Sequence, residues 1–190
     1  MEKRNKAVFL DRDGTINEDT GYIDDVAKFK LLPKVPEAIK LLNEAGFKVI
    51  VVTNQSGVAR GFFTEDKVRE INRKMQQELC KKGAIIDAVY FCPHHPRIGN
   101  PRYRKICNCR KPKPGLLKQA AREHNIDLSS SYMVGDDLRD IQAGYNAGCK
   151  TVLLRGEKVN ALSSKSIDTF NPRPHYVCEN LYQAARWICS

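Results

Sequence analysis

Short apolar runs alternate along the chain with longer segments in which apolar residues recur at helical spacing. Short runs predict buried strands, and the periodic segments predict amphipathic helices. The expected strands are Ala7–Leu10, Lys48–Val52, Ala88–Phe91, Tyr132–Val134, Thr151–Leu154 and Tyr176–Cys178. The expected helices are Val35–Ala45, Thr64 (as N-cap) to about Lys82, Gly115–Asn125, Leu138–Ala147 and Leu181–Ile188. This alternation predicts an α/β fold with a doubly wound, Rossmann-like parallel sheet.

Two segments interrupt the alternation. Cys92–Lys113 has no periodicity and is rich in Pro, Arg and Cys, and Arg155–Arg173 is predicted to be a loop. We find no linker or internal repeat, so we expect one domain over residues 1–190 with an insert at about 92–110. In a doubly wound sheet the ligand binds outside the carboxyl ends of the strands, which is where the site is sought.

Composition and charge narrow the partners. The chain has 190 residues, 42% of them hydrophobic, but no apolar run long enough for a transmembrane helix. The N-terminus lacks the apolar core of a signal peptide, so we expect a cytoplasmic protein without a membrane partner. The net charge of +10 fits an anionic partner, either a phosphorylated metabolite or nucleic acid, although solubility alone would also explain it. Basic residues crowd into one segment: Arg97, Arg102, Arg104, Lys105, Arg110, Lys111 and Lys113.

Two carboxylates follow the first strand. Asp11 and Asp13 are spaced i, i+2 and precede Gly14, which allows a tight turn. Such a pair suits Mg²⁺, and it suits phosphoryl transfer with one nucleophile and one general acid/base. A polar turn after a strand would have the same local sequence.

Two further polar residues follow later in the chain. Thr53 sits just past the second expected strand, where a hydroxyl can bind phosphate oxygens, and a simple strand-end turn is the alternative. Lys111 is held extended by Pro112 and could neutralise charge that develops on a phosphoryl group. A solvated basic loop is the alternative for Lys111.

Carboxylates also follow the strand Tyr132–Val134. Asp136 is placed to complete a Mg²⁺ site with Asp11. Asp137 and Asp140 could instead cap the helix that follows, and the role of Asp137 stays open.

The insert carries a metal-ligand pattern. Cys92-x-His94 and Cys107-x-Cys109 supply four ligands for a closed, tetrahedral Zn²⁺ site, and geometry alone would allow His95 in place of His94. Free cysteines in a loop are the alternative. The remaining cysteines are scattered in apolar settings, where we expect buried thiols without a functional role: Cys80, Cys149, Cys178 and Cys189.

Taken together, the four strand-end motifs resemble those of the haloacid dehalogenase superfamily of phosphotransferases. The cysteine loop is similar to that of its small, capless histidinol-phosphate and heptose-bisphosphate phosphatases. The resemblance covers nearly the whole chain, and its most similar pieces are Phe9–Asn17, Gly21–Tyr22, Thr53–Gly61, Cys92–Pro96, Cys107–Pro112 and Tyr132–Asp136.

The resemblance implies roles for these residues. Asp11 would form an aspartyl-phosphate, and Asp13 would protonate the leaving oxygen and then activate water. Thr53 and Lys111 would hold the phosphoryl oxygens. Mg²⁺ would bind Asp11, the backbone carbonyl of Asp13, and Asp136, whereas Zn²⁺ would bind Cys92, His94, Cys107 and Cys109. The implied substrate-binding residues are Arg12, Asp19, Tyr22, Asn54, Gln55, Ser56 and Arg110.

The implied activity is Mg²⁺-dependent removal of the 7-phosphate from a heptose 1,7-bisphosphate, in the biosynthesis of nucleotide-activated heptose. The expected form is a monomer without a large cap domain, and its expected partner is a phosphorylated sugar. A histidinol-phosphate phosphatase is the first alternative, but crowded Arg and Lys suit a cationic substrate poorly. A nucleic-acid 3′-end phosphatase or binding module is the second, and the chain lacks the aromatic-interleaved basic stripe that nucleic acid would favour.

Overall fold

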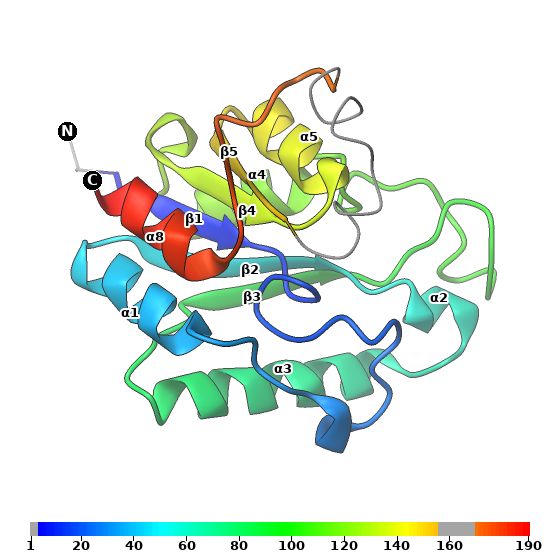
Figure 1. Ribbon diagram of the computed structural model, residues 1–190. Coiled ribbons are helices and arrows are strands. Elements are labelled where there is room, and N and C mark those ends of the chain that lie inside the picture. Colours follow the sequence, from blue (N-terminus) through cyan, green and yellow to red (C-terminus); the bar gives the residue numbers. More distant parts are fainter. Residues whose placement is uncertain (1–3, 156–169) are drawn as a thin grey trace.

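The computed structural model describes residues 4–155 and 170–190 (Figure 1). Six strands of these residues form one sheet in the order β3-β2-β1-β4-β5-β6, and every neighbouring pair is parallel. The strands are β1 Ala7–Leu10, β2 Lys48–Asn54, β3 Ala88–Cys92, β4 Tyr132–Gly135, β5 Lys150–Leu154 and β6 Tyr176–Cys178. The predicted doubly wound parallel sheet is therefore confirmed, with the strand order that this fold usually has.

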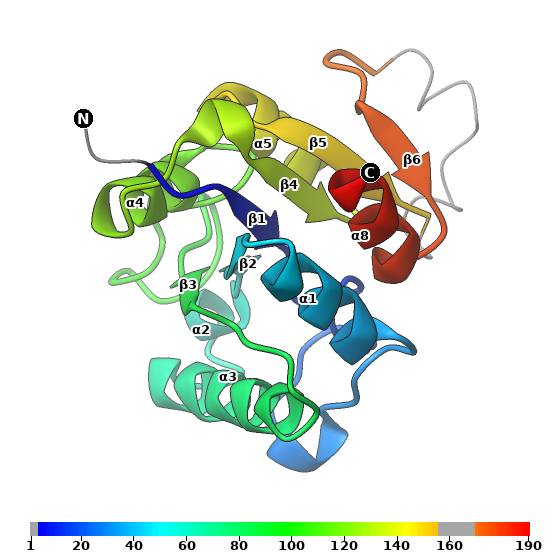
Figure 2. The same ribbon diagram turned by 90° about the vertical axis from the view of Figure 1, so that its left-hand side faces the viewer.

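Helices cover both faces of the sheet (Figure 2). The longer ones are α1 Val35–Glu44, α3 Glu65–Cys80, α4 Gly115–Glu123, α5 Leu138–Ala147 and α8 Leu181–Cys189. Short elements that the periodicity did not predict are α2 Gly57–Arg60 and the 3₁₀ turns Val26–Lys28 and Leu128–Ser130. The α4 helix ends two residues before the prediction, where Asn125 takes a left-handed conformation with φ of 50°.

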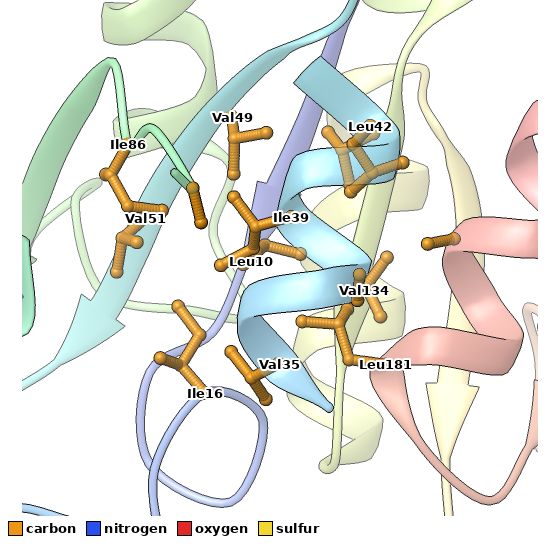
Figure 3. Packing of buried hydrophobic residues seen from close by; sticks show 14 of the residues in the cluster. Leu10, Ile16, Val35, Ile39, Leu42, Val49, Val51, Ile86, Val134 and Leu181 are labelled. Atoms are coloured by element: carbon orange, nitrogen blue, oxygen red, sulfur yellow. The ribbon is translucent and has the colours of Figure 1, made fainter. Parts of the chain in front are cut away.

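The alternation of side chains along β1 explains why two faces are covered. Val8 and Leu10 point into a core shared with α1, α3 and α8, whereas Ala7 and Phe9 point into a second core under α4 and α5. Figure 3 shows Leu10 beside Ile39 of α1 in the first core. Because β1 is buried on both sides, its sequence is continuously apolar, as expected for a central parallel strand.

The pairing of β2 corrects one expectation. Thr53 does not lie just past the strand, because parallel pairing with β3 continues through Thr53 opposite Phe91 and Asn54 opposite Cys92. The polar end of β2 is thereby paired in the sheet in the same way as its apolar part. Thr53 stands at the carboxyl edge of the sheet as a strand residue.

The insert after β3 contains no regular helix or strand across 93–113 and returns to the sheet edge at α4. Within the residues described, no separate cap domain covers the carboxyl edge. The middle of the predicted loop Arg155–Arg173, residues 156–169, lies outside the described residues. None of the helices in 4–155 and 170–190 has the length and apolar character needed to cross a membrane.

Candidate active site

A cavity of about 410 Å³ lies at the carboxyl edge of the sheet, where the strand order changes direction between β1 and β4. It is lined by Asp11, Asp13, Asp19, Gly21, Tyr22, Thr53, Asn54, Ser56, Arg60, His95, Arg110, Lys111, Asp137, Arg139 and Asp140. The four predicted strand-end segments all reach this region. Most of the predicted catalytic, substrate-binding and Mg²⁺-binding residues line it, and of these only Arg12, Gln55 and Asp136 do not.

Lys111 is almost completely enclosed at the base of the cavity, with 2% of its surface exposed. Its Nζ lies 2.8 Å from Asp11 Oδ1 and 2.7 Å from Asp140 Oδ1, and it donates to the carbonyl of Val52 at 2.8 Å. Burial opposes the charge, but the two carboxylates outweigh it, so the pKa of Lys111 is raised. Lys111 therefore carries a fixed positive charge beside Asp11.

The Lys111 main chain is anchored to β2 by a side-chain amide. Asn54 donates from Nδ2 to the Lys111 carbonyl, and its Oδ1 accepts from the Lys111 N–H, both at 3.1 Å. Through these two bonds Asn54 fixes the height of the lysine above the sheet.

The Asp13 carboxylate is held by three side chains. Arg12 donates to both of its oxygens, Asn17 donates to Oδ1 at 3.0 Å, and Gln55 donates to Oδ2 at 2.7 Å. Arg12 is only 1% exposed and also donates to Asn72. Arg12 and Gln55, expected among the substrate-binding residues, therefore lie behind the cavity wall in contact with Asp13, because pairing with a carboxylate allows an arginine to be buried.

Three carboxylates gather beside the cavity. Oxygens of Asp11, Asp136 and Asp140 lie within 4.8 Å of one another, an arrangement that could hold a hard cation such as Mg²⁺. Gly14 permits this approach: its φ is +86°, and a Cβ there would stand 2.2 Å from Asp136 Oδ2. The glycine is thus required for its conformation and for its lack of a side chain.

The sequence predicted Asp140 only as a possible helix cap. In the structure its carboxylate makes two kinds of contact. It forms a capping box with Asp137 at the start of α5 and also pairs with Lys111. Burial, outweighing Lys111, raises its pKa to about 7. Its position at N3 of α5 was the signal, because an acidic side chain at N3 turns back toward the N-cap residue, here Asp137, which directly follows Asp136.

Asp137 caps α5 and binds Arg139, which donates to both of its carboxylate oxygens. Arg139, Arg60 and His95 also line the cavity without having been predicted there. His95 Nδ1 accepts from the backbone N–H groups of Arg97 at 3.2 Å and Ile98 at 3.0 Å, which leaves the ring proton on Nε2. Burial and then the charges of Arg110, Arg60 and Arg97 lower the pKa of His95.

The insert is gathered around a Cys/His cluster. The Sγ atoms lie 3.1 Å (Cys107 to Cys109), 3.3 Å (Cys92 to Cys109) and 3.6 Å (Cys92 to Cys107) apart, and His94 Nδ1 is 3.3 Å from Cys109 Sγ. A tetrahedral metal with bonds of about 2.3 Å spaces its sulfur ligands by about 3.8 Å. The cluster could therefore hold one metal ion, and it includes His94 rather than His95.

Several known proteins are similar to this chain in sequence and in fold. The protein from Yersinia pestis named D-glycero-beta-D-manno-heptose-1,7-bisphosphate 7-phosphatase is 44% identical over 164 residues, which are 85% of this chain and 87% of that relative. The Escherichia coli K12 protein of the same name is 41% identical over 170 residues, 88% of this chain and 89% of that relative. A family model described as "HAD-hyrolase-like" matches residues 108–184.

A solved structure agrees. The crystal structure of D,D-heptose 1,7-bisphosphate phosphatase from B. bronchiseptica, complexed with magnesium and phosphate, has a TM-score of 0.83 and 36% identity and covers 96% of this chain and 97% of that one. The sequence and the fold are those of a haloacid dehalogenase-like phosphatase, which confirms the predicted resemblance. Within that class, the chain belongs to the D-glycero-beta-D-manno-heptose-1,7-bisphosphate 7-phosphatase family.

Proposed function

We propose that this protein removes the 7-phosphate from D-glycero-beta-D-manno-heptose 1,7-bisphosphate through an aspartyl-phosphate intermediate. The observation that carries the proposal is the meeting of Asp11, Asp13 and Lys111 in one cavity, in a chain so similar to phosphatases of that name. The β-anomer is proposed because the relatives' names specify it.

The contacts of Asp11 suggest which oxygen attacks. The Arg12 N–H donates to Oδ1 at 2.7 Å and Lys111 Nζ lies 2.8 Å from the same oxygen, so Oδ2 is the proposed nucleophile. The bond from Oδ2 to phosphorus forms as the bond from phosphorus to the sugar oxygen breaks. Asp13 gives its proton to that leaving oxygen and then takes a proton from the water that attacks phosphorus. This second step releases inorganic phosphate and restores Asp11.

Two further side chains would stabilise the phosphoryl oxygens. The Thr53 hydroxyl accepts from Gln55 Nε2 at 2.9 Å, which leaves its own proton free to be donated to a phosphoryl oxygen. The buried charge of Lys111 is strong because little water screens it. Arg12, Asn17 and Gln55 act as positioning residues for Asp13.

Two metal ions are proposed from the donor sets. Mg²⁺ would be held by Asp11, the backbone carbonyl of Asp13, and Asp136, and when bound it would offset phosphoryl charge. Zn²⁺ would be held by the Cys/His cluster of Cys92, His94, Cys107 and Cys109. Four protein ligands leave that ion no open position, so its role would be to shape the insert.

The finer setting is also proposed. We infer a single-domain monomer over residues 1–190 that acts in the cytoplasm on a phosphorylated sugar, within the biosynthesis of nucleotide-activated heptose for lipopolysaccharide or a related glycan. Size-exclusion chromatography with light scattering tests the monomer, since a dimer would elute at twice the 21.5 kDa chain mass.

The function is tested by phosphate release with Mg²⁺ from both anomers of heptose 1,7-bisphosphate, histidinol phosphate, fructose 1,6-bisphosphate and a 3′-phosphorylated oligonucleotide. We expect strong preference for the β-heptose bisphosphate and loss of activity in Asp11→Asn. Preference for histidinol phosphate or the oligonucleotide, or activity that survives in Asp11→Asn, would overturn the proposal.

A further inference from the structure

Arg60 lines the cavity, although nothing in the predicted chemistry uses it. It is the last residue of the short helix α2, which follows β2 at the carboxyl edge of the sheet. Among the described residues, no carboxylate lies within ion-pair distance of Arg60, and its buried Nε has no hydrogen-bond partner. A buried donor without a partner is costly, which suggests that a ligand completes this site.

Other arginines near the cavity differ in this respect. Arg12 is paired with Asp13 and Arg139 with Asp137, so their charges are compensated within the protein. Arg110 donates to the carbonyl of His94 at 3.1 Å and is paired with no carboxylate among the residues described. Arg60 and Arg110 are thus the two cavity arginines whose charge is available to an anion.

Arg60 also contacts an aromatic residue that lines the same cavity. Its guanidinium lies 5.9 Å from the centroid of the Tyr22 ring, within the range of a cation–π interaction. Tyr22 in turn packs edge-on against Phe62, with centroids 4.8 Å apart. Both aromatic residues are substantially exposed, and Tyr22 lines the cavity together with Arg60. We call this exposed side of the cavity its mouth.

The insert braces the same helix. The N–H of Asn100 donates to the Ala59 carbonyl at 2.8 Å, and Gly99 lies so close that a Cβ would stand 1.8 Å from that oxygen. The loop that carries His95 and Arg110 is therefore docked directly on the residue before Arg60. The three donors Arg60, Arg110 and His95 Nε2–H belong to one braced wall of the cavity.

We propose that Arg60 is a specificity-determining residue that binds the distal phosphate, the one the enzyme leaves on the sugar, together with Arg110. This inference rests on the proposed function. A dianionic phosphate matches the pair because guanidinium groups bind phosphate oxygens through directed, charge-assisted hydrogen bonds. Arg60 thereby makes the enzyme select a bisphosphate over a monophosphate that carries the same reacting group.

The test measures kcat/KM on heptose 1,7-bisphosphate and on heptose 7-phosphate, which lacks the distal phosphate. We expect Arg60→Gln to lower the bisphosphate-to-monophosphate ratio of kcat/KM by about 10- to 100-fold, mainly through KM, as for loss of hydrogen bonds to a charged group. Arg60→Lys keeps the charge and should recover part of the ratio. Arg73→Gln removes the same charge from an exposed site on α3 and should leave the ratio unchanged.

A binding readout separates recognition from folding. The product heptose 1-phosphate carries only the distal phosphate, so its inhibition constant should rise by a similar factor in Arg60→Gln, more than that of inorganic phosphate. A wild-type preference for the bisphosphate that Arg60→Gln and Arg60→Lys both retain would overturn this inference alone. A wild-type enzyme that releases no phosphate from the bisphosphate would overturn the proposed function and this inference with it.

Discussion

The two ends of the cavity treat charge in opposite ways. At the sheet edge, Lys111 is enclosed between Asp11 and Asp140 and forms an ion pair with each of them. At the mouth, neither Arg60 nor Arg110 forms an ion pair with a carboxylate among the residues described. The first arrangement holds reacting groups rigidly, whereas the second leaves cations for an incoming anion. Reaction and recognition thus depend on different side chains, and these can be substituted separately.

The largest effect is expected at the reacting end, from Asp11→Asn. An amide cannot act as the nucleophile, so kcat should fall by roughly 10⁴-fold or more. Phosphate release after affinity and ion-exchange purification measures it. Asp24→Asn, on an exposed carboxylate paired with Lys28, is the matched control and should retain activity. More than about 1% residual activity in Asp11→Asn would contradict the nucleophile assignment.

Lys111→Met should destabilise the folded protein, because it removes the buried cation at the sheet edge. Removing the buried cation leaves Asp11 and Asp140 without compensation, which costs about 3–5 kcal/mol in the free energy of unfolding. Urea unfolding measures this loss, and activity should disappear with it. The exposed neighbour Lys113→Met should change stability by less than about 0.5 kcal/mol. Equal stabilities for the two variants would show that the ion pairs at Lys111 are not formed in solution.

Disrupting the Cys/His cluster should act first on the mouth. Cys109→Ser, or removal of the metal by a chelator, should lower Tm by about 5 °C or more and raise KM for the bisphosphate, because the insert carries Arg110 and braces α2. Thermal melting and metal analysis of the purified protein check both claims. Cys80→Ser is the control: this thiol was expected to be buried, but it is exposed at the end of α3 and lies outside the cluster. A purified protein without bound metal and with unchanged Tm on chelation would refute the site.

The smallest effect distinguishes backbone strain from close contact at Gly14. Gly14→Ala and Gly46→Ala both place alanine at positive φ, +86° and +78°, but only the first meets a neighbour, Asp136. Each should lose about 1 kcal/mol to strain, and Gly14→Ala should lose roughly 1–2 kcal/mol more and bind Mg²⁺ more weakly. Chemical unfolding and Mg²⁺ titration of activity measure the difference. Identical losses would mean that the approach of Asp136 is not constrained.

The sequence was sufficient to predict those parts of the structure in which a local pattern is compatible with only one arrangement. Apolar runs such as Ala7–Leu10 are buried on both faces, and carboxylates after such runs must lie at the edge of a parallel sheet. The parallel sheet, the convergence of the four motifs and the gathering of the cysteine loop were predicted from these patterns. Helix α5 likewise begins and ends at the predicted residues, because its cap and its glycine stop are local signals.

Tertiary pairing was beyond the sequence. From the sequence, Arg12 was expected to face the cavity beside Asp13. The side chains that enclose it, including Asn72, come from distant positions in the chain, so its burial was not predicted. The ion pair of Asp140 with Lys111 was not predicted, because the role of Asp140 as a helix cap already explained the residue. Arg60 lies on a four-residue helix that has no periodicity to detect, and its significance depends on the absence of a partner among the described residues. Periodicity can be read from a short segment, whereas the residues that a side chain contacts depend on the whole fold.

Cys109, Arg110 and Lys111 are consecutive residues: a cluster ligand, a mouth cation and the buried lysine. Because adjacent Cα atoms are only about 3.8 Å apart, a shift of the cluster would pull directly on the main chain that carries both cations. If the cluster holds zinc, the fraction of competent enzyme follows the supply of a trace nutrient as well as the amount of protein made. Growth in zinc-poor medium would then reduce flux through this step before any change in gene expression.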